Sequence, residues 1–159
     1  MTNSSDIQYP HAVLTSIDGE PTPPQLRCLT EEVIANFGAV YSRPNGTHGL
    51  MGEVLSADEY NELSPETPYV KPTHPGDTPT TAANQQALLV AITEYEHRLK
   101  AYNDCVKANA DIRAQIMNAV NPTYYRSLRD KKSGYHKVCV CLKRLDLLLR
   151  NKPHPHKIQ

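Results

Sequence analysis

The chain has 159 residues, of which 39% are hydrophobic and 21% are charged, and this length suits one compact domain or two small helical lobes. Its formal net charge is zero, but residues 1–125 carry 7 basic and 15 acidic side chains, whereas residues 126–159 carry 10 basic and 2 acidic ones. The longest apolar run, residues 87–92, is far shorter than the roughly 20 residues that cross a bilayer, which excludes a transmembrane span.

The first expected element is a helix over residues 22–38, preceded by an N-terminal arm over residues 1–21. Thr22 can cap this helix, Pro23 fits its first turn and Gln25 completes a capping box. Four apolar residues then recur at steps of three and four, so one face of the helix should be buried. These residues are Leu26, Leu29, Val33 and Phe37.

Residues 42–52 hold three glycines and a proline and should form a loop, with a short strand expected over residues 50–55. Ser56 and Glu59 form a second capping box, which predicts two turns of helix. These elements complete an N-terminal helical segment over residues 22–64. Five prolines follow between Pro65 and Pro79, so residues 65–80 should form a Pro-rich linker.

The longest helical pattern begins after Thr80 or Thr81. Its apolar residues recur at alternating steps of four and three, which makes a narrow seam. The apolar seam comprises Leu88, Ile92, Tyr95, Leu99, Tyr102 and Val106. This seam could pack against helix 22–38 within the chain, which is the interpretation we favour. It could instead form a contact between two copies of the chain. The candidate residues for that contact are Leu88, Ile92, Tyr95, Leu99 and Tyr102.

Beyond the seam the apolar stripe drifts round the helix to Ile112, Ile116 and Val120, so we expect a bend or a break near Asn109. Asn121-Pro122 should end the helix. A charged hinge over residues 130–134 and a last helix with Val138, Leu142, Leu145 and Leu149 complete a C-terminal helical segment over residues 81–150. Residues 151–159 should be a disordered basic tail. The predicted fold class is all-α, a helical bundle or two small lobes with Pro-rich connections.

The basic end of the chain suits an anionic partner. RNA or single-stranded nucleic acid, or the acidic half of another copy, would complement it, and a solvated helix end is the plainer alternative. The candidate nucleic-acid contacts are Arg126, Arg129, Lys131, Lys132, Lys143 and Arg144. Tyr124 and Tyr125 adjoin these cations and could stack on bases, although ordinary burial is the interpretation we favour.

No pattern in the sequence predicts a catalytic centre. His136, Cys139, Cys141, His154 and His156 are candidate zinc ligands, but Cys139 and Cys141 lie on nearly opposite sides of the expected helix, so we expect no metal. A nucleophile elbow and a phosphate-binding loop are both missing. We therefore expect no enzyme, no cofactor, no small-molecule substrate and no membrane partner. Without a secretory leader pattern, we also expect a cytoplasmic chain with reduced cysteines.

The order of segments resembles the Gag capsid region of copia-type LTR retrotransposons, in the divergent form of microalgal genomes. The resemblance rests on four stretches that follow one another from Tyr9 to Leu149. These are Asp18-Gly-Glu-Pro-Thr22, His48-Gly-Leu-Met-Gly52 with Glu59-Tyr60-Asn-Glu-Leu63, Pro72-Thr-His-Pro-Gly76, and Ala119-Val120-Asn-Pro-Thr-Tyr124-Tyr125-Arg-Ser-Leu128 with Gly134-Tyr135.

The resemblance implies a helical, non-catalytic structural protein that binds copies of itself around RNA. The chain departs from the family in its last residues, which suggest a truncated or frame-shifted member, and in lacking the Cys-rich knuckle that many Gag proteins use on RNA. A small intracellular adaptor that binds nucleic acid or protein, unrelated to capsids, is the alternative function.

Overall fold

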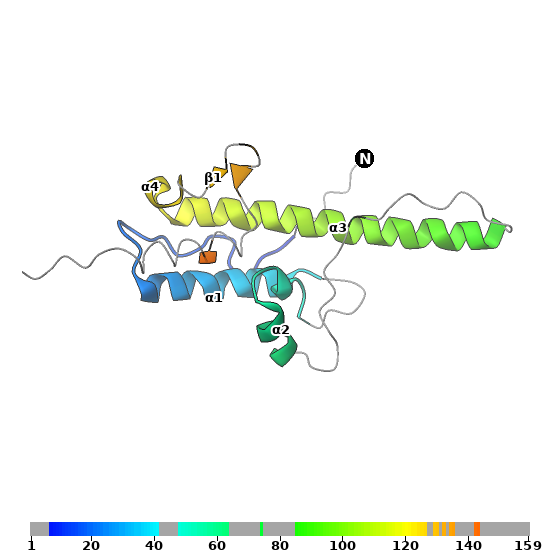
Figure 1. The fold of residues 1–159 in the computed structure, drawn as a ribbon, viewed down its shortest axis with the longest axis horizontal. Coiled ribbons are helices and arrows are strands. Elements are labelled where there is room, and N and C mark those ends of the chain that lie inside the picture. Colours follow the sequence, from blue (N-terminus) through cyan, green and yellow to red (C-terminus); the bar gives the residue numbers. More distant parts are fainter. Residues whose placement is uncertain are drawn as a thin grey trace, which may run out of the picture.

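The computed structural model describes residues 7–41, 48–63, 74, 85–126, 129–130, 132, 134–135 and 142–143. These residues are mostly helical, which confirms the all-α prediction. Two helices, α1 (Pro23–Ala39) and α3 (Gln85–Ala119), lie side by side in opposite directions (Figure 1). Most of the predicted linker and the whole predicted tail lie outside the described residues, as does most of the predicted last helix.

Helix α1 begins and ends where the sequence predicts within one residue. The predicted capping box is present: the Gln25 side chain accepts a hydrogen bond from the Thr22 backbone N–H at 3.0 Å. The face with Leu26, Leu29, Val33 and Phe37 is buried.

The segment after α1 folds back onto the end of that helix. Leu50 donates its backbone N–H to the Phe37 carbonyl at 2.8 Å, which satisfies one of the acceptors that a helix end leaves open. Gly49 makes this turn with a φ of 56°, and a Cβ there would overlap the Gly38 carbonyl oxygen. The next residues form a 3-10 helix, η1 (Met51–Glu53), so the strand predicted over residues 50–55 is wrong. Successive i→i+3 bonds satisfy its backbone locally.

Helix α2 (Ala57–Leu63) confirms the second capping box. Ser56 donates its backbone N–H to Glu59 Oε2 at 2.8 Å, and the Glu59 N–H returns a bond to Ser56 Oγ at 3.3 Å. The Ser56 N–H and the Ser56 hydroxyl, which also donates to Glu59 Oε2 at 2.8 Å, lower the pKa of the Glu59 carboxyl, and the nearby Lys143 ammonium lowers it further. Tyr60 anchors the helix because its side chain is fully buried.

Helix α3 is continuous past Asn109, so the break that the sequence allows there does not occur. Asn109 is buried, and its Nδ2 donates to Glu53 Oε2 at 3.3 Å and to the Cys105 carbonyl at 3.0 Å. One partner, Glu53, belongs to η1, and the other is a carbonyl of the preceding turn of α3, so the amide ties η1 to a helix that stays continuous. Asn121 then caps α4 (Pro122–Tyr125) by accepting the Thr123 N–H at 3.0 Å.

Residues 7–21 lie between α1 and the second half of α3 (Figure 1). Leu14 and Ile17 are buried, and Ile17 donates its N–H to the Ala119 carbonyl at 2.8 Å in a parallel bridge with Val120. Asn36 is also buried and holds this segment on α1, because its side chain accepts from the His11 N–H and donates to the His11 carbonyl. The segment that the sequence presents as an arm therefore contributes buried side chains to the core.

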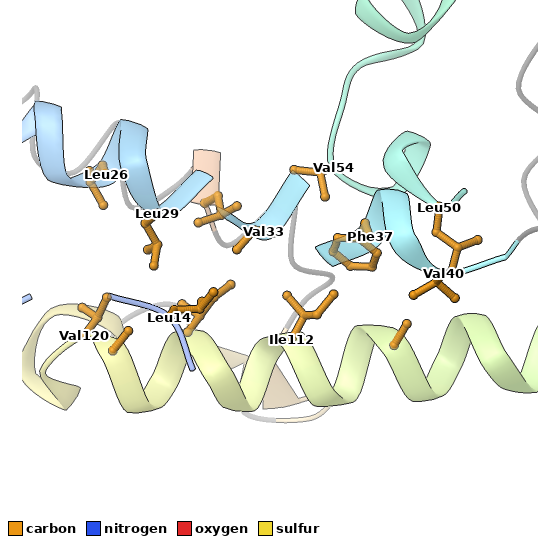
Figure 2. Close-up of a cluster of buried hydrophobic side chains, with 14 of the residues drawn as sticks. Leu14, Leu26, Leu29, Val33, Phe37, Val40, Leu50, Val54, Ile112 and Val120 are labelled. Carbon is orange, nitrogen blue, oxygen red and sulfur yellow. The ribbon is translucent and has the colours of Figure 1, made fainter. Parts of the chain in front are cut away.

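One cluster of buried side chains draws on the N-terminal residues, α1, the turn after it and the second half of α3 (Figure 2). The α3 members are Cys105, Ala108, Ile112, Ile116 and Ala119, with Val120 after the helix end. Leu142 also belongs to it. Two short antiparallel strands, β1 (Arg129–Asp130) and β2 (Gly134–Tyr135), lie at the two ends of the segment predicted as a charged hinge.

Candidate self-association surface

The two long helices differ in length by a factor of two. With a rise of about 1.5 Å per residue, the 35 residues of α3 extend over about 52 Å, whereas the 17 residues of α1 extend over about 26 Å. Helix α1 can therefore cover only half of α3. The covered half is the second, and the first half of α3 continues beyond α1 (Figure 1).

The apolar seam lies on this first half of α3. None of its six residues belongs to the buried cluster. Ile92 is 38% exposed and Val106 is 50% exposed, while Leu88, Tyr95, Leu99 and Tyr102 are half-buried. Two further apolar residues on the same turns, Leu89 and Val90, are 64% and 55% exposed. The prediction that the seam turns to helix 22–38 is therefore wrong, because the residues that meet α1 come later in the chain.

The seam and the core-facing stripe lie on different sides of α3. The adjacent residues Cys105 and Val106 mark the change, since Cys105 is 6% exposed and Val106 is 50% exposed. At 3.6 residues per turn the two side chains point about 100° apart. The seam stops there, because its next two positions hold Asn109 and Arg113. A partner along the seam would therefore approach from a side that α1 does not occupy.

One residue of the predicted linker contacts the seam. The His74 ring lies edge-on to the Tyr102 ring, with 4.9 Å between the ring centroids. This contact covers the seam close to the point where the packed core begins.

Charged side chains flank the seam on both sides. Glu96 and Arg98 are exposed and lie on opposite edges of the apolar stripe. Lys100 pairs with Asp104 at 3.1 Å on the outer side of the helix. The surface thus combines apolar positions every three or four residues with a different charge at each edge, as in helices that associate with other helices.

The candidate nucleic-acid contacts are spread over several elements. Arg126 follows α4, Lys132 lies between β1 and β2, and Lys143 lies beside Glu59; all three are exposed. Arg129 belongs to β1, while Lys131 and Arg144 lie outside the described residues.

Tyr124 and Tyr125 both pack against the buried cluster, and Tyr125 donates its hydroxyl to the Met117 carbonyl at 3.2 Å. Half-buried rings of this kind are ordinary core tyrosines. The packing favours the burial interpretation of the sequence over base stacking.

The described residues contain no group of three or more His, Cys, Asp or Glu side chains placed to bind a metal ion. The five candidate zinc ligands lie outside them. An open hollow of about 290 Å³ lies between α3 and Tyr41, just after the end of α1, and its lining includes His97 and the Lys100–Asp104 pair. No described helix is both long and apolar enough to cross a bilayer.

Comparisons with known proteins identify no relative, since no protein-family model, no curated protein and no solved structure matches the chain. The support for any function therefore comes from the chain's own residues.

Proposed function

We propose that this chain is a non-catalytic, Gag-like structural protein that associates with copies of itself through the first half of α3. One observation carries the proposal: a 35-residue helix has an apolar seam on the half that α1 does not cover. Apolar area that contacts water in one chain is removed from water when two such faces meet, at about 25 cal/mol per Å². The segment order that resembles copia-type Gag proteins supports the same kind of function.

The position of the seam allows a mutational test that separates association from folding. Because Ile92 lies outside the buried cluster, Ile92→Asp should weaken association without unfolding the monomer. A matched control is His97→Asp, which places the same charge on the opposite, exposed side of the same helix. Sedimentation velocity over a range of concentrations measures association, and thermal unfolding of dilute samples measures folding.

The parent chain and His97→Asp should both form dimers or larger species as concentration rises. Ile92→Asp should remain monomeric over the same range and should unfold at the same temperature as the parent. A parent chain that sediments as a single monomer up to its solubility limit would contradict the proposal. That result would favour the adaptor, for which the seam is a surface that binds a different protein.

Weak RNA contact through the basic end is the second part of the proposal. Its support is the local excess of cations in residues 126–159 and the exposure of Arg126, Lys132 and Lys143. Such contact would be independent of base sequence, because it depends on release of counterions from phosphates.

A further inference from the structure

We propose that the partner of the seam is α3 of a second copy, and that the two helices pair in parallel and in register. The inference rests on the proposed self-association and adds its geometry: each seam residue should face its own counterpart. Its support comes from the residue types within the seam and from the charges at its two edges.

The seam alternates between two positions of a heptad. Ile92, Leu99 and Val106 occupy the position called a, while Leu88, Tyr95 and Tyr102 occupy the position called d. Two of the three residues at position a, Ile92 and Val106, are β-branched, and position d holds Leu88. β-Branched residues at a with Leu at d favour a two-stranded parallel pair. The seam spans 19 residues, from 88 to 106, and therefore fewer than three heptads. Because the seam is this short, we expect the association to be weak and reversible.

The edge charges distinguish a parallel pair from an antiparallel one. Glu96 occupies the edge position called e, and Arg98 occupies the opposite edge position called g. In an antiparallel pair each g position lies beside the partner's g, and each e lies beside the partner's e. The antiparallel register that overlaps the whole seam would therefore place Arg98 beside a second Arg98 and Glu96 beside a second Glu96. Like charges at these positions disfavour the pairing.

A parallel pair removes both repulsions. Each g position then lies beside an e position of the partner in the following heptad. Arg98 meets the amide Asn103, and Ala91 meets Glu96, so no two like charges face each other along the seam. A cation beside a neutral amide also costs little, because both side chains are exposed and keep water as a partner.

The folded core is compatible with this arrangement. The stripe of α3 that packs on α1 lies about 100° round the helix from the seam, as the burial of Cys105 and the exposure of Val106 indicate. In a parallel pair the two cores lie at the same end and on opposite sides of the paired helices. In the antiparallel register they would lie at opposite ends.

Disulfide trapping distinguishes the two registers. The four native cysteines are first replaced (Cys28→Ser, Cys105→Ala, Cys139→Ser, Cys141→Ser), and the thermal unfolding and sedimentation of this background are measured. Ile92→Cys is then added. In the parallel pair two copies of residue 92 face each other at about 6 Å between Cα atoms, within reach of a disulfide. In the full antiparallel register residue 92 faces Tyr102, which lies about 15 Å along the helix from it.

We expect Ile92→Cys alone to become mostly dimeric on mild oxidation, as measured by intact mass without reductant. His97→Cys, on the opposite side of the same helix, is the control and should cross-link at least tenfold less. A chain that sediments as a dimer but cross-links only when Ile92→Cys is mixed with Tyr102→Cys overturns the parallel register and leaves self-association standing. A dimer that cross-links in neither way excludes the seam as the interface. A background that folds but stays monomeric at all concentrations overturns both proposals.

Discussion

Two glycines with positive φ make a matched pair for separating backbone strain from steric overlap. Gly19 has a φ of 74° and nothing within 4 Å of an added Cβ, whereas Gly49 has a φ of 56° and faces the Gly38 carbonyl. Gly19→Ala should therefore lower the free energy of unfolding by only the strain of about 1–2 kcal/mol. Gly49→Ala should cost about 1–3 kcal/mol more, because the end of α1 must also move.

Urea unfolding of both variants measures this difference. Equal decreases in the free energy of unfolding would mean that the turn after α1 can shift to accommodate the added Cβ while the Leu50–Phe37 hydrogen bond stays intact. The comparison also tests whether the His48–Gly52 stretch is held in shape by its contact with α1 or only by its turn.

Glu32 gives the fold a specific dependence on pH. Thr15 donates its N–H to Glu32 Oε2 at 3.0 Å and its hydroxyl to Oε1 at 2.6 Å. Burial opposes the charge, but the two Thr15 bonds, together with the nearby His11, lower the pKa of Glu32 below its ordinary value of 4.5. Because the folded pKa is the lower one, the stabilisation is complete above about pH 4.5 and is lost as the pH falls through the folded pKa.

The variant Glu32→Gln should lose this dependence, so its free energy of unfolding should fall less steeply with acid below pH 4.5. Glu31→Gln is the control, since Glu31 is the exposed neighbour on α1, and it should keep the pH dependence of the parent. Urea unfolding at pH values from about 3 to about 7, a range that includes carboxyl titration, measures both. If the free energy of unfolding fell equally steeply with acid in the two variants, the Thr15–Glu32 hydrogen bonds would not be the source of the pH dependence.

At the scale of the element, α3 should respond to mutation differently in its two halves. Ile112 is fully buried against α1, so Ile112→Ala should lower the free energy of unfolding by about 2–5 kcal/mol. Ile92→Ala makes the same kind of change on the same helix. It should cost less than about 1 kcal/mol in dilute monomer, because Ile92 lies outside the cluster.

Chemical unfolding at the lowest measurable protein concentration compares the two variants without a contribution from association. At high protein concentration Ile92→Ala should lower the free energy of unfolding by more than it does in dilute monomer, since it also removes apolar area from the proposed interface. A large loss for Ile92→Ala in dilute monomer would place residue 92 in a folded contact within its own chain.

Local signals in the sequence predict the elements well. Thr22 and Ser56 mark helix starts and Asn121-Pro122 marks the end of the long helix, as the structure confirms, because caps, breakers and periodicity act within one or two turns. The choice of partner for each apolar face could not be predicted in the same way. The seam and the Ile112 stripe have similar periodicity, and only the length of α1 and its alignment with the second half of α3 decide which one is buried.

The contact of Ile17 with Val120 is also invisible to local patterns, since 102 residues separate them in the sequence. Residues 7–21 have no helical period, which is why the sequence presents them as an arm. Their burial depends on a groove that exists only once α1 and α3 are together. Leu14 and Ile17 are nevertheless apolar residues of that stretch that could have suggested burial.

At the scale of the whole molecule, the uneven charge along the chain predicts salt-dependent RNA binding. Arg126→Gln with Lys132→Gln should weaken binding of single-stranded RNA, which we expect no tighter than about 10⁻⁶ M in the parent. The slope of log affinity against log salt should flatten by up to about 1.4, at about 0.7 for each phosphate that is no longer neutralised. Fluorescence anisotropy at several salt concentrations measures both quantities.

The control pair, Arg27→Gln with Lys100→Gln, removes two exposed cations from α1 and α3 and should leave the salt slope unchanged. Equal effects of the two pairs would show that binding follows net charge and not the basic end. If no RNA binding were detected at low salt, the remaining candidate partner of the basic end would be the acidic half of another copy.

The place of residues 7–21 inside the core fixes when the protein can fold during synthesis. Chains leave the ribosome from the N-terminus, at about 5–20 residues per second. Ile17 is therefore made early, but its partner Val120 comes 103 residues later, just after the α3 face that covers it. For at least several seconds Leu14, Ile17 and the apolar face of α1 have nothing to pack against. A nascent chain shorter than about 120 residues should consequently remain open to proteases and chaperones, and protection should appear abruptly once α3 has emerged.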